Sequence, residues 1–157
     1  MKKAVLIILA GLGSSLVLAQ NLKKAEVPAL VIAKFTSLYP NVTNEEWEKE
    51  DGNYEAEFET DEKETNVIID VSGNLLGSSA EVGPNDLPKA IIEYAGKNFP
   101  GKKLKEMTKM TDSKGIVTYE IEIQKDEMIF DANGNFVRKE EEKDDDDKDD
   151  DDRKKED

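Results

Sequence analysis

The chain has 157 residues and a formal net charge of −14, and it contains neither cysteine nor histidine. The missing cysteines exclude disulfides, thiolate metal sites, cysteine nucleophiles and a lipid-modified cysteine, and the missing histidines remove the commonest general base and transition-metal ligand. The negative charge argues against nucleic acid and anionic membrane surfaces as partners, because two polyanions repel each other.

Residues 1–19 have the pattern of a secretory signal peptide. Lys2 and Lys3 precede an apolar run, and Val17 and Ala19 place small or short residues at the −3 and −1 positions before Gln20. An uncleaved membrane anchor is the alternative, but the run is shorter than the roughly 18 residues that a span needs. We therefore expect cleavage after Ala19, a periplasmic or secreted protein, and no stable membrane span after cleavage.

One stretch occurs twice, from Val27 and again from Leu87, at a constant offset of 60 residues. Pro28 and Pro88 are placed to open a helix as its first residue, with Asp86 as a candidate N-cap in the second copy. A second proline, twelve residues after the first, ends each helix. The apolar positions at helical spacing are Val27, Val31, Ile32, Phe35, Leu38 and Tyr39 in one copy, and Ile91, Ile92, Ala95 and Phe99 in the other.

Strand patterns follow each helix. Residues 54–58 and 119–123 alternate apolar and polar side chains, which predicts strands with one buried and one wet face. Asp-x-x-Gly turns at Asp70 and Asp131 close the next hairpins. Further strands are expected around Trp47, over residues 104–110, 64–71 and 126–133, and onward from Leu75 and Phe136.

The repeats differ in loop length. The second copy has about five extra residues near 112–115, whereas residues 60–64 make the longer hairpin of the first copy. We divide the chain into a signal peptide (1–19), an N-terminal linker (20–26), repeat 1 (27–82), repeat 2 (87–139) and a disordered acidic tail (140–157). The tail holds 13 acidic and 5 basic residues. Its DDDDK stretch also matches an enteropeptidase site, so an added tail is the alternative.

Carboxylates are the only abundant functional groups. The candidate partner-binding residues are the outward-facing glutamates Glu55, Glu57, Glu59, Glu120 and Glu122. They could recognise a cationic partner, or they could be a solvated face paired across strands with Lys63, Lys105, Lys109 and Lys125. Trp47 and the strand tyrosines are interpreted as core residues.

The Asp70 and Asp131 turns superficially resemble the start of a calcium loop. Their glycines stand at the fourth position instead of the sixth, which favours simple hairpin turns, although Glu81 and Glu142 fall at the twelfth. Weak calcium binding by these turns and the tail is the alternative function. No catalytic pair is singled out, so we predict no enzymatic activity, no catalytic residue and no cofactor.

The assembled pattern resembles the PepSY-like family of exported bacterial proteins, which are described as β-lactamase-inhibitor-like. The resemblance rests on the helix-opening prolines, Tyr39-Pro40, Phe99-Pro100, Trp47, the strand at Gly52-Asn53-Tyr54 and the Asp-x-x-Gly turns. It covers residues 27–139, although Met107 stands where the second copy would repeat Trp47.

This resemblance implies an α+β fold in which tandem helix-plus-four-strand repeats form one curved antiparallel sheet with two helices on one face. It also implies a non-enzymatic, exported binding module. The expected partner is a protein bound by the exposed sheet face and hairpins, and peptidase inhibition is the sharpest version of that role.

Overall fold

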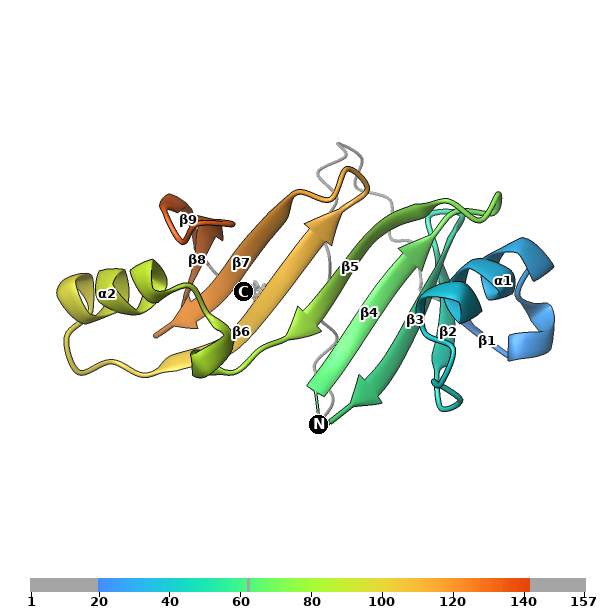
Figure 1. Cartoon of the computed structure of the whole chain (residues 1–157), viewed down its shortest axis with the longest axis horizontal. Helices are drawn as coiled ribbons and strands as arrows, with labels where there is room; N and C mark the ends of the chain where they lie inside the picture. The colour runs from blue at the N-terminus through green and yellow to red at the C-terminus, as the bar shows by residue number, and fades with distance from the viewer. Residues whose placement is uncertain (1–19, 62, 142–157) are drawn as a thin grey trace, which may run out of the picture.

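The computed structural model describes residues 20–61 and 63–141. Nine strands form one antiparallel sheet in which the spatial order is the chain order, β1 to β9 (Figure 1). The helices are α1 (Ala29–Leu38) and α2 (Lys89–Asn98), each preceded by a short 3-10 helix, η1 (Lys24–Glu26) and η2 (Pro84–Asp86). The strands are β1 (Gln20–Leu22), β2 (Glu46–Glu50), β3 (Asn53–Thr60), β4 (Lys63–Ile69), β5 (Leu75–Glu81), β6 (Leu104–Asp112), β7 (Val117–Ile123), β8 (Asp126–Asp131) and β9 (Phe136–Glu141).

The expected α+β fold is confirmed: each repeat contributes one helix and four strands to a single sheet. The register places the core residues beneath α1 and those beneath α2 on the same face of the sheet. In Figure 1 the helices lie toward opposite ends of the sheet, with β5 between them. The two repeats therefore share a sheet but have separate hydrophobic cores.

The first core forms where α1 meets β2, β3 and β4. Phe35 is buried, and its ring makes edge-on contacts with Trp47 at 5.2 Å and with Phe58 at 5.4 Å between centroids. Such pairs add to the free energy of area burial by about 0.5–1.5 kcal/mol. The interpretation of Trp47 as a core residue is confirmed.

The second core repeats this plan with a mixture of aliphatic and aromatic side chains. Ile91 of α2 is fully buried among Ile121, Ile123 and Phe130. Met107 stands opposite Ile121, as Trp47 stands opposite Ala56. The strand bulges next to Met107, where Glu106 adopts a φ of 39°.

Two members of the predicted helical stripes are not core residues. Leu38 is 39 % exposed and Ile92 is 40 % exposed. A ten-residue helix resting on a sheet can bury only a narrow stripe, so the apolar residues at its margins remain in water.

The helices begin one residue later than predicted. Pro28 and Pro88 have extended ψ angles of 142° and 134°, so each is the residue before the helix instead of its first residue. Asp86 does not cap α2, because it belongs to η2, where its carboxylate accepts a hydrogen bond from the Gly83 N–H at 3.0 Å. The ends of both helices agree with the prediction, because α1 ends before Pro40 and α2 ends before Pro100.

The chain ends also differ from expectation. The predicted linker of residues 20–26 contains β1, whose three residues pair with β2, and the 3-10 helix η1. At the other end, β9 includes residues 140 and 141, which the sequence pattern assigns to the acidic tail. The signal peptide, its cleavage site and residues 142–157 of the acidic tail lie outside the described residues.

The Asp-x-x-Gly segments form the predicted hairpin turns, and they also support the helices. Gly73 and Gly134 have φ angles of +85° and +83°, which favour glycine. A side chain at Gly73 would meet the backbone oxygen of Leu30 at 3.0 Å, and one at Gly134 would meet Pro88 at 3.0 Å. The start of each helix thus rests directly on the turn of its own repeat.

Candidate protein-binding face

The face of the sheet opposite the helices, hereafter the open face, is lined mainly by glutamates in the first repeat. Alternation along each strand sends Tyr54, Ala56 and Phe58 to the core and the glutamates between them to the other side. The register extends this division across the neighbouring strands. The open-face residues of β2, β3 and β4 are Glu46, Glu48, Glu50, Asn53, Glu55, Glu57, Glu59, Glu64, Asn66 and Ile68.

Several of these glutamates stand directly opposite one another. Glu46 is opposite Glu57, Glu48 is opposite Glu55, and Glu59 is opposite Glu64. Like charges in directly opposed positions of a sheet destabilise it. The open face of the first repeat therefore keeps a charge pattern that opposes folding.

Burial sharpens this repulsion at Glu55. The side chain is half-buried, and its pKa is raised from 4.5 to about 7 by burial and then by the negative charges of Glu50, Glu48, Glu57 and Glu64. This carboxyl group is therefore close to half-protonated at neutral pH.

Glu120 is the residue of the second repeat that is equivalent to Glu55. Glu55 directly follows Tyr54 in β3, and Glu120 directly follows Tyr119 in β7. Its pKa is also raised from 4.5 to about 7, by burial and by Glu127 and Glu140. Here a cation opposes the shift, because Arg138 lowers the pKa of Glu120. The second repeat also pairs Lys105 with Glu122, whose side-chain atoms are 3.0 Å apart.

The expected pairing of glutamates with lysines is thus confirmed for Glu122 and Lys105 and is wrong for the first repeat. Among the described residues, no ion pair joins Glu55, Glu57 or Glu59 to a cation. Lys109 shares the helix-covered face with Tyr119, opposite which it stands. Lys125 lies in the turn between β7 and β8.

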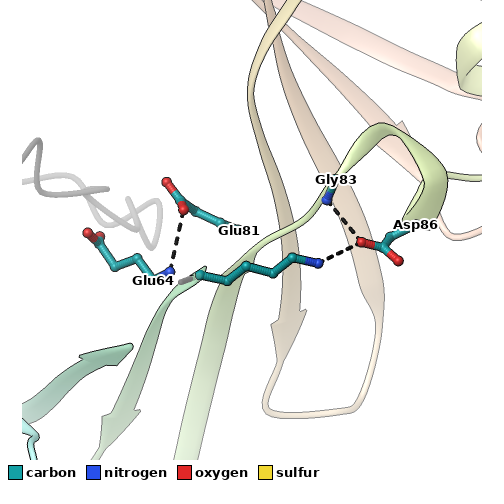
Figure 2. A network of polar contacts seen from close by, with 5 residues as sticks. Glu64, Glu81, Gly83 and Asp86 are labelled. Atoms are coloured by element: carbon teal, nitrogen blue, oxygen red, sulfur yellow. Dashed lines mark hydrogen bonds and ion pairs between the residues drawn. The ribbon is translucent and has the colours of Figure 1, made fainter. Parts of the chain in front are cut away.

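Lys63 is engaged at the junction between the repeats. Its Nζ donates to Asp86 Oδ2 at 2.7 Å, and the Gly83 N–H donates to the same oxygen (Figure 2). Beside it the Glu64 N–H donates to the Glu81 carboxylate at 3.4 Å. This network fastens β4 and β5 to η2, the segment that leads into the second repeat.

Buried polar residues on the open face are a feature that the sequence prediction missed. Asn66, Ser79 and Thr108 are each at most 5 % exposed, and the register places all three on the open face. Asn66 donates to Glu64, but its Oδ1 has no hydrogen-bond partner among the described residues. The sequence predicts strands at all three positions, but it does not show which polar side chains of those strands are buried.

The two turn aspartates have structural partners. Asp70 Oδ1 accepts from the N–H groups of Ser72 and Asn74 at 2.8 and 2.9 Å, and Oδ2 accepts from the Asn74 side chain. Asp131 makes the same set with Asn133 and Asn135. Hydrogen bonds from the side chain and backbone of Asn74 lower the pKa of Asp70, and those of Asn135 lower the pKa of Asp131.

A third turn of this kind escaped the sequence prediction. Asp112-Ser-Lys-Gly115 occupies the five-residue insertion of the second repeat, and Asp112 Oδ1 accepts from Lys114 and Ile116 at 2.8 Å. Within residues 20–61 and 63–141, no three acidic side chains are grouped so that they could hold a metal ion. The same residues include no helix with the length and apolarity to cross a membrane.

Two consecutive segments of the chain, residues 18–77 and 78–138, match the family described as "Putative beta-lactamase-inhibitor-like, PepSY-like". Together they take up well over half of the sequence. The chain belongs to this family. The boundary between the PepSY-like segments falls within β5, the strand that pairs with the first repeat on one side and the second on the other.

Two solved structures with this fold come from Bacteroides species. A protein from B. eggerthii described as a "putative periplasmic" protein is 15 % identical, with a TM-score of 0.67 over 73 % of this chain and 88 % of that one. A "BLIP-like protein" from B. fragilis is 20 % identical, with a TM-score of 0.59 over 73 % and 86 %. At these identities the likeness shows the fold alone. No curated protein matches the chain.

Proposed function

We propose that this PepSY-like protein is a non-enzymatic, exported binding module that holds a protein partner against its open face and the adjoining hairpins. The observation that carries the proposal is the open face itself. Both helices pack on the other face, yet the open face holds buried polar and half-buried acidic side chains. A surface that only needed to be soluble would have no reason to enclose such groups.

The family and its solved members support this proposal. The family description is β-lactamase-inhibitor-like, and one structural neighbour is called BLIP-like. An inhibitor of an exported enzyme, such as a peptidase, is the narrower form of the proposal. Export itself is supported by the signal-like residues 1–19 and by the neighbour described as "putative periplasmic".

The hairpins extend the surface unequally. In the first repeat, β3 and β4 have 8 and 7 residues, whereas β7 and β8 of the second repeat have 7 and 6. The predicted longer hairpin at residues 60–64 thus arises from longer strands. The asymmetry gives a partner a means of distinguishing the two repeats.

Site-specific photocrosslinking tests the proposal. A benzoyl-phenylalanine at Glu57 would place the crosslinker on the open face, and one at Leu30, which is 62 % exposed on α1, would place it on the helix side. With the exported fraction of the source cells, we expect a discrete crosslinked protein from position 57 and none from position 30. Equal crosslinking from both positions, or crosslinking from position 30 alone, would refute a role for the open face.

A further inference from the structure

We propose that the open face of the first repeat binds an arginine- or lysine-bearing segment of a protein partner, and that Asn66 Oδ1 accepts a hydrogen bond from that segment. This inference rests on the proposed function and adds the chemistry of the partner. It commits to the first repeat, over β2, β3 and β4, and not to the sheet as a whole.

The first line of support is the contrast between the repeats. In the second repeat, cations from the chain itself lie among the open-face glutamates, namely Lys105 beside Glu122 and Arg138 beside Glu140. In the first repeat, the open-face positions of β2, β3 and β4 hold no lysine or arginine. The negative charge of the same scaffold is thus partly offset by the chain's own cations in the second repeat and is not offset in this way in the first.

The second line of support is Asn66, an independent observation that points to a ligand. This side chain is 3 % exposed, and its Oδ1 has no hydrogen-bond partner among the described residues. A buried carbonyl oxygen without a donor has lost its hydrogen bonds to water and gained none from the protein, which is unfavourable. Asn66 lies on the open face between Glu57 of β3 and Ser79 of β5, so a donor that reaches it must come from that face.

The ligand must therefore combine positive charge with N–H donors. A guanidinium or ammonium group meets both needs, since each has several donors and no acceptor. A bare metal ion meets them less well, because no three acidic side chains among the described residues converge on one point. Cationic side chains spaced along a polypeptide can instead pair with glutamates spread over three strands.

The charged groups around Glu55 add a proton linkage. Its neighbours are Glu48 and Glu50 on β2, Glu57 on β3 and Glu64 on β4, all acidic. A cation bound among them would favour the ionised carboxylate, so binding near neutral pH would release a proton. Affinity should accordingly rise between pH 6 and pH 8.

The test uses an eight-residue peptide of alternating arginine and serine, with blocked ends, and a control peptide in which citrulline replaces arginine. Binding to the full-length protein is measured by calorimetry at about 150 mM salt, where weak surface attraction is screened. We expect saturable binding of one arginine peptide per protein and at least a ~10-fold weaker interaction with the citrulline peptide, equal to about 1.4 kcal/mol. Equal binding of both peptides, or no binding of the arginine peptide, would overturn the inference.

Matched double variants locate the site. Glu55→Gln/Glu57→Gln removes two carboxyl groups from the first repeat, and Glu120→Gln/Glu122→Gln removes two carboxyl groups from the equivalent positions of the second. We expect about a tenfold loss of affinity from the first pair and less than about a threefold loss from the second. Equal losses of affinity from the two double variants would mean that the peptide responds only to the overall electrostatic field of the protein. That result would refute the assignment of the site to the first repeat.

Asn66→Leu keeps the net charge of the protein and removes the Asn66 Oδ1 atom. It therefore distinguishes a direct hydrogen bond to Asn66 from electrostatic attraction between the peptide and the protein. We expect about a threefold to tenfold loss of affinity. Because this variant could lose its fold, the wild-type Asn66 side-chain amide is also followed by NMR during titration, and an unshifted signal at saturation would refute the contact. Photocrosslinking from position 57 does not depend on a charged peptide, so the proposed function can survive if this inference fails.

Discussion

Glu55 and Glu120 occupy equivalent places in the two repeats, and each has a carboxyl pKa near 7. Burial beside other carboxylates is the cause in both, because it disfavours the charged form. In the unfolded chain these groups would titrate near 4.5. Between those two values the folded protein binds more protons than the unfolded chain, so each residue makes stability depend on pH.

The sign of this effect follows directly. The stabilisation is complete below about pH 4.5 and is lost as the pH rises through 7, so the free energy of unfolding should fall between pH 5.5 and pH 8.5. After allowance for partial exposure, each glutamate should account for about 1–2 kcal/mol of that fall. Urea unfolding at both pH values measures it.

The double variant Glu55→Gln/Glu120→Gln should flatten this dependence and should be more stable than the wild type at pH 8.5. Glu93→Gln is the control, since Glu93 is exposed on α2 and forms an ion pair with Lys89 four residues earlier. It should leave the slope unchanged. A double variant with the wild-type slope would show that these two carboxyl groups are not the source.

Most helices and strands of this fold could be predicted from the amino-acid sequence. Prolines marked both ends of each helix, and alternation in residues 54–58 and 119–123 revealed the strands together with their buried faces. β1 could not be found this way, because its three residues form a strand only by pairing with β2. The third turn, at Asp112, was hidden because it lies in the insertion that has no counterpart in the first copy.

The candidate site was only half predictable. The glutamates could be assigned to one face from alternation alone, but their neighbours depend on register, which one sequence does not define. Lys63 and Lys109 were expected beside them, yet both lie on the other face or at its margin. Asn66 could not be singled out, because burial on an uncovered face depends on the side chains of adjacent strands.

Helix α2 offers a direct test of which residues form the second core. Ile91 and Ile92 are neighbours of the same type, but Ile91 is fully buried and Ile92 is 40 % exposed. Ile91→Ala should cost about 2–4 kcal/mol of unfolding free energy, because it removes buried methylene groups and leaves a cavity. Ile92→Ala should cost less than about 1 kcal/mol. Chemical denaturation of both variants decides the point, and similar losses would contradict the packing described above.

For the molecule as a whole, the dominant electrostatic feature is repulsion. The net charge is −14, and opposed glutamates concentrate part of it on one end of the open face. Repulsion between exposed charges is screened by salt, since the Debye length falls to less than 10 Å above about 0.1 M. The folded state, in which these charges are closest together, gains most from that screening.

Raising NaCl from about 20 mM to about 500 mM should therefore increase the free energy of unfolding by on the order of 1 kcal/mol. The melting temperature, Tm, at several salt concentrations measures this effect. The Glu55→Gln/Glu57→Gln variant should respond less than the wild type, and Glu120→Gln/Glu122→Gln should lie between them, because cations already offset part of its repulsion. A Tm that falls with salt would contradict the role assigned to repulsion.

The sheet order of β1 to β9 has a consequence for how the chain folds. Within the described residues, each strand pairs with the strands before and after it along the chain. Most of these pairings are hairpins, whereas the β1–β2 and β5–β6 pairings each enclose a helix. Low contact order favours rapid folding, because little loop entropy is lost before each pairing is made. A chain that emerges from its N-terminus can thus add one strand at a time to a growing edge, and only β2 and β6, among the described strands, follow a helix before they pair with the preceding strand.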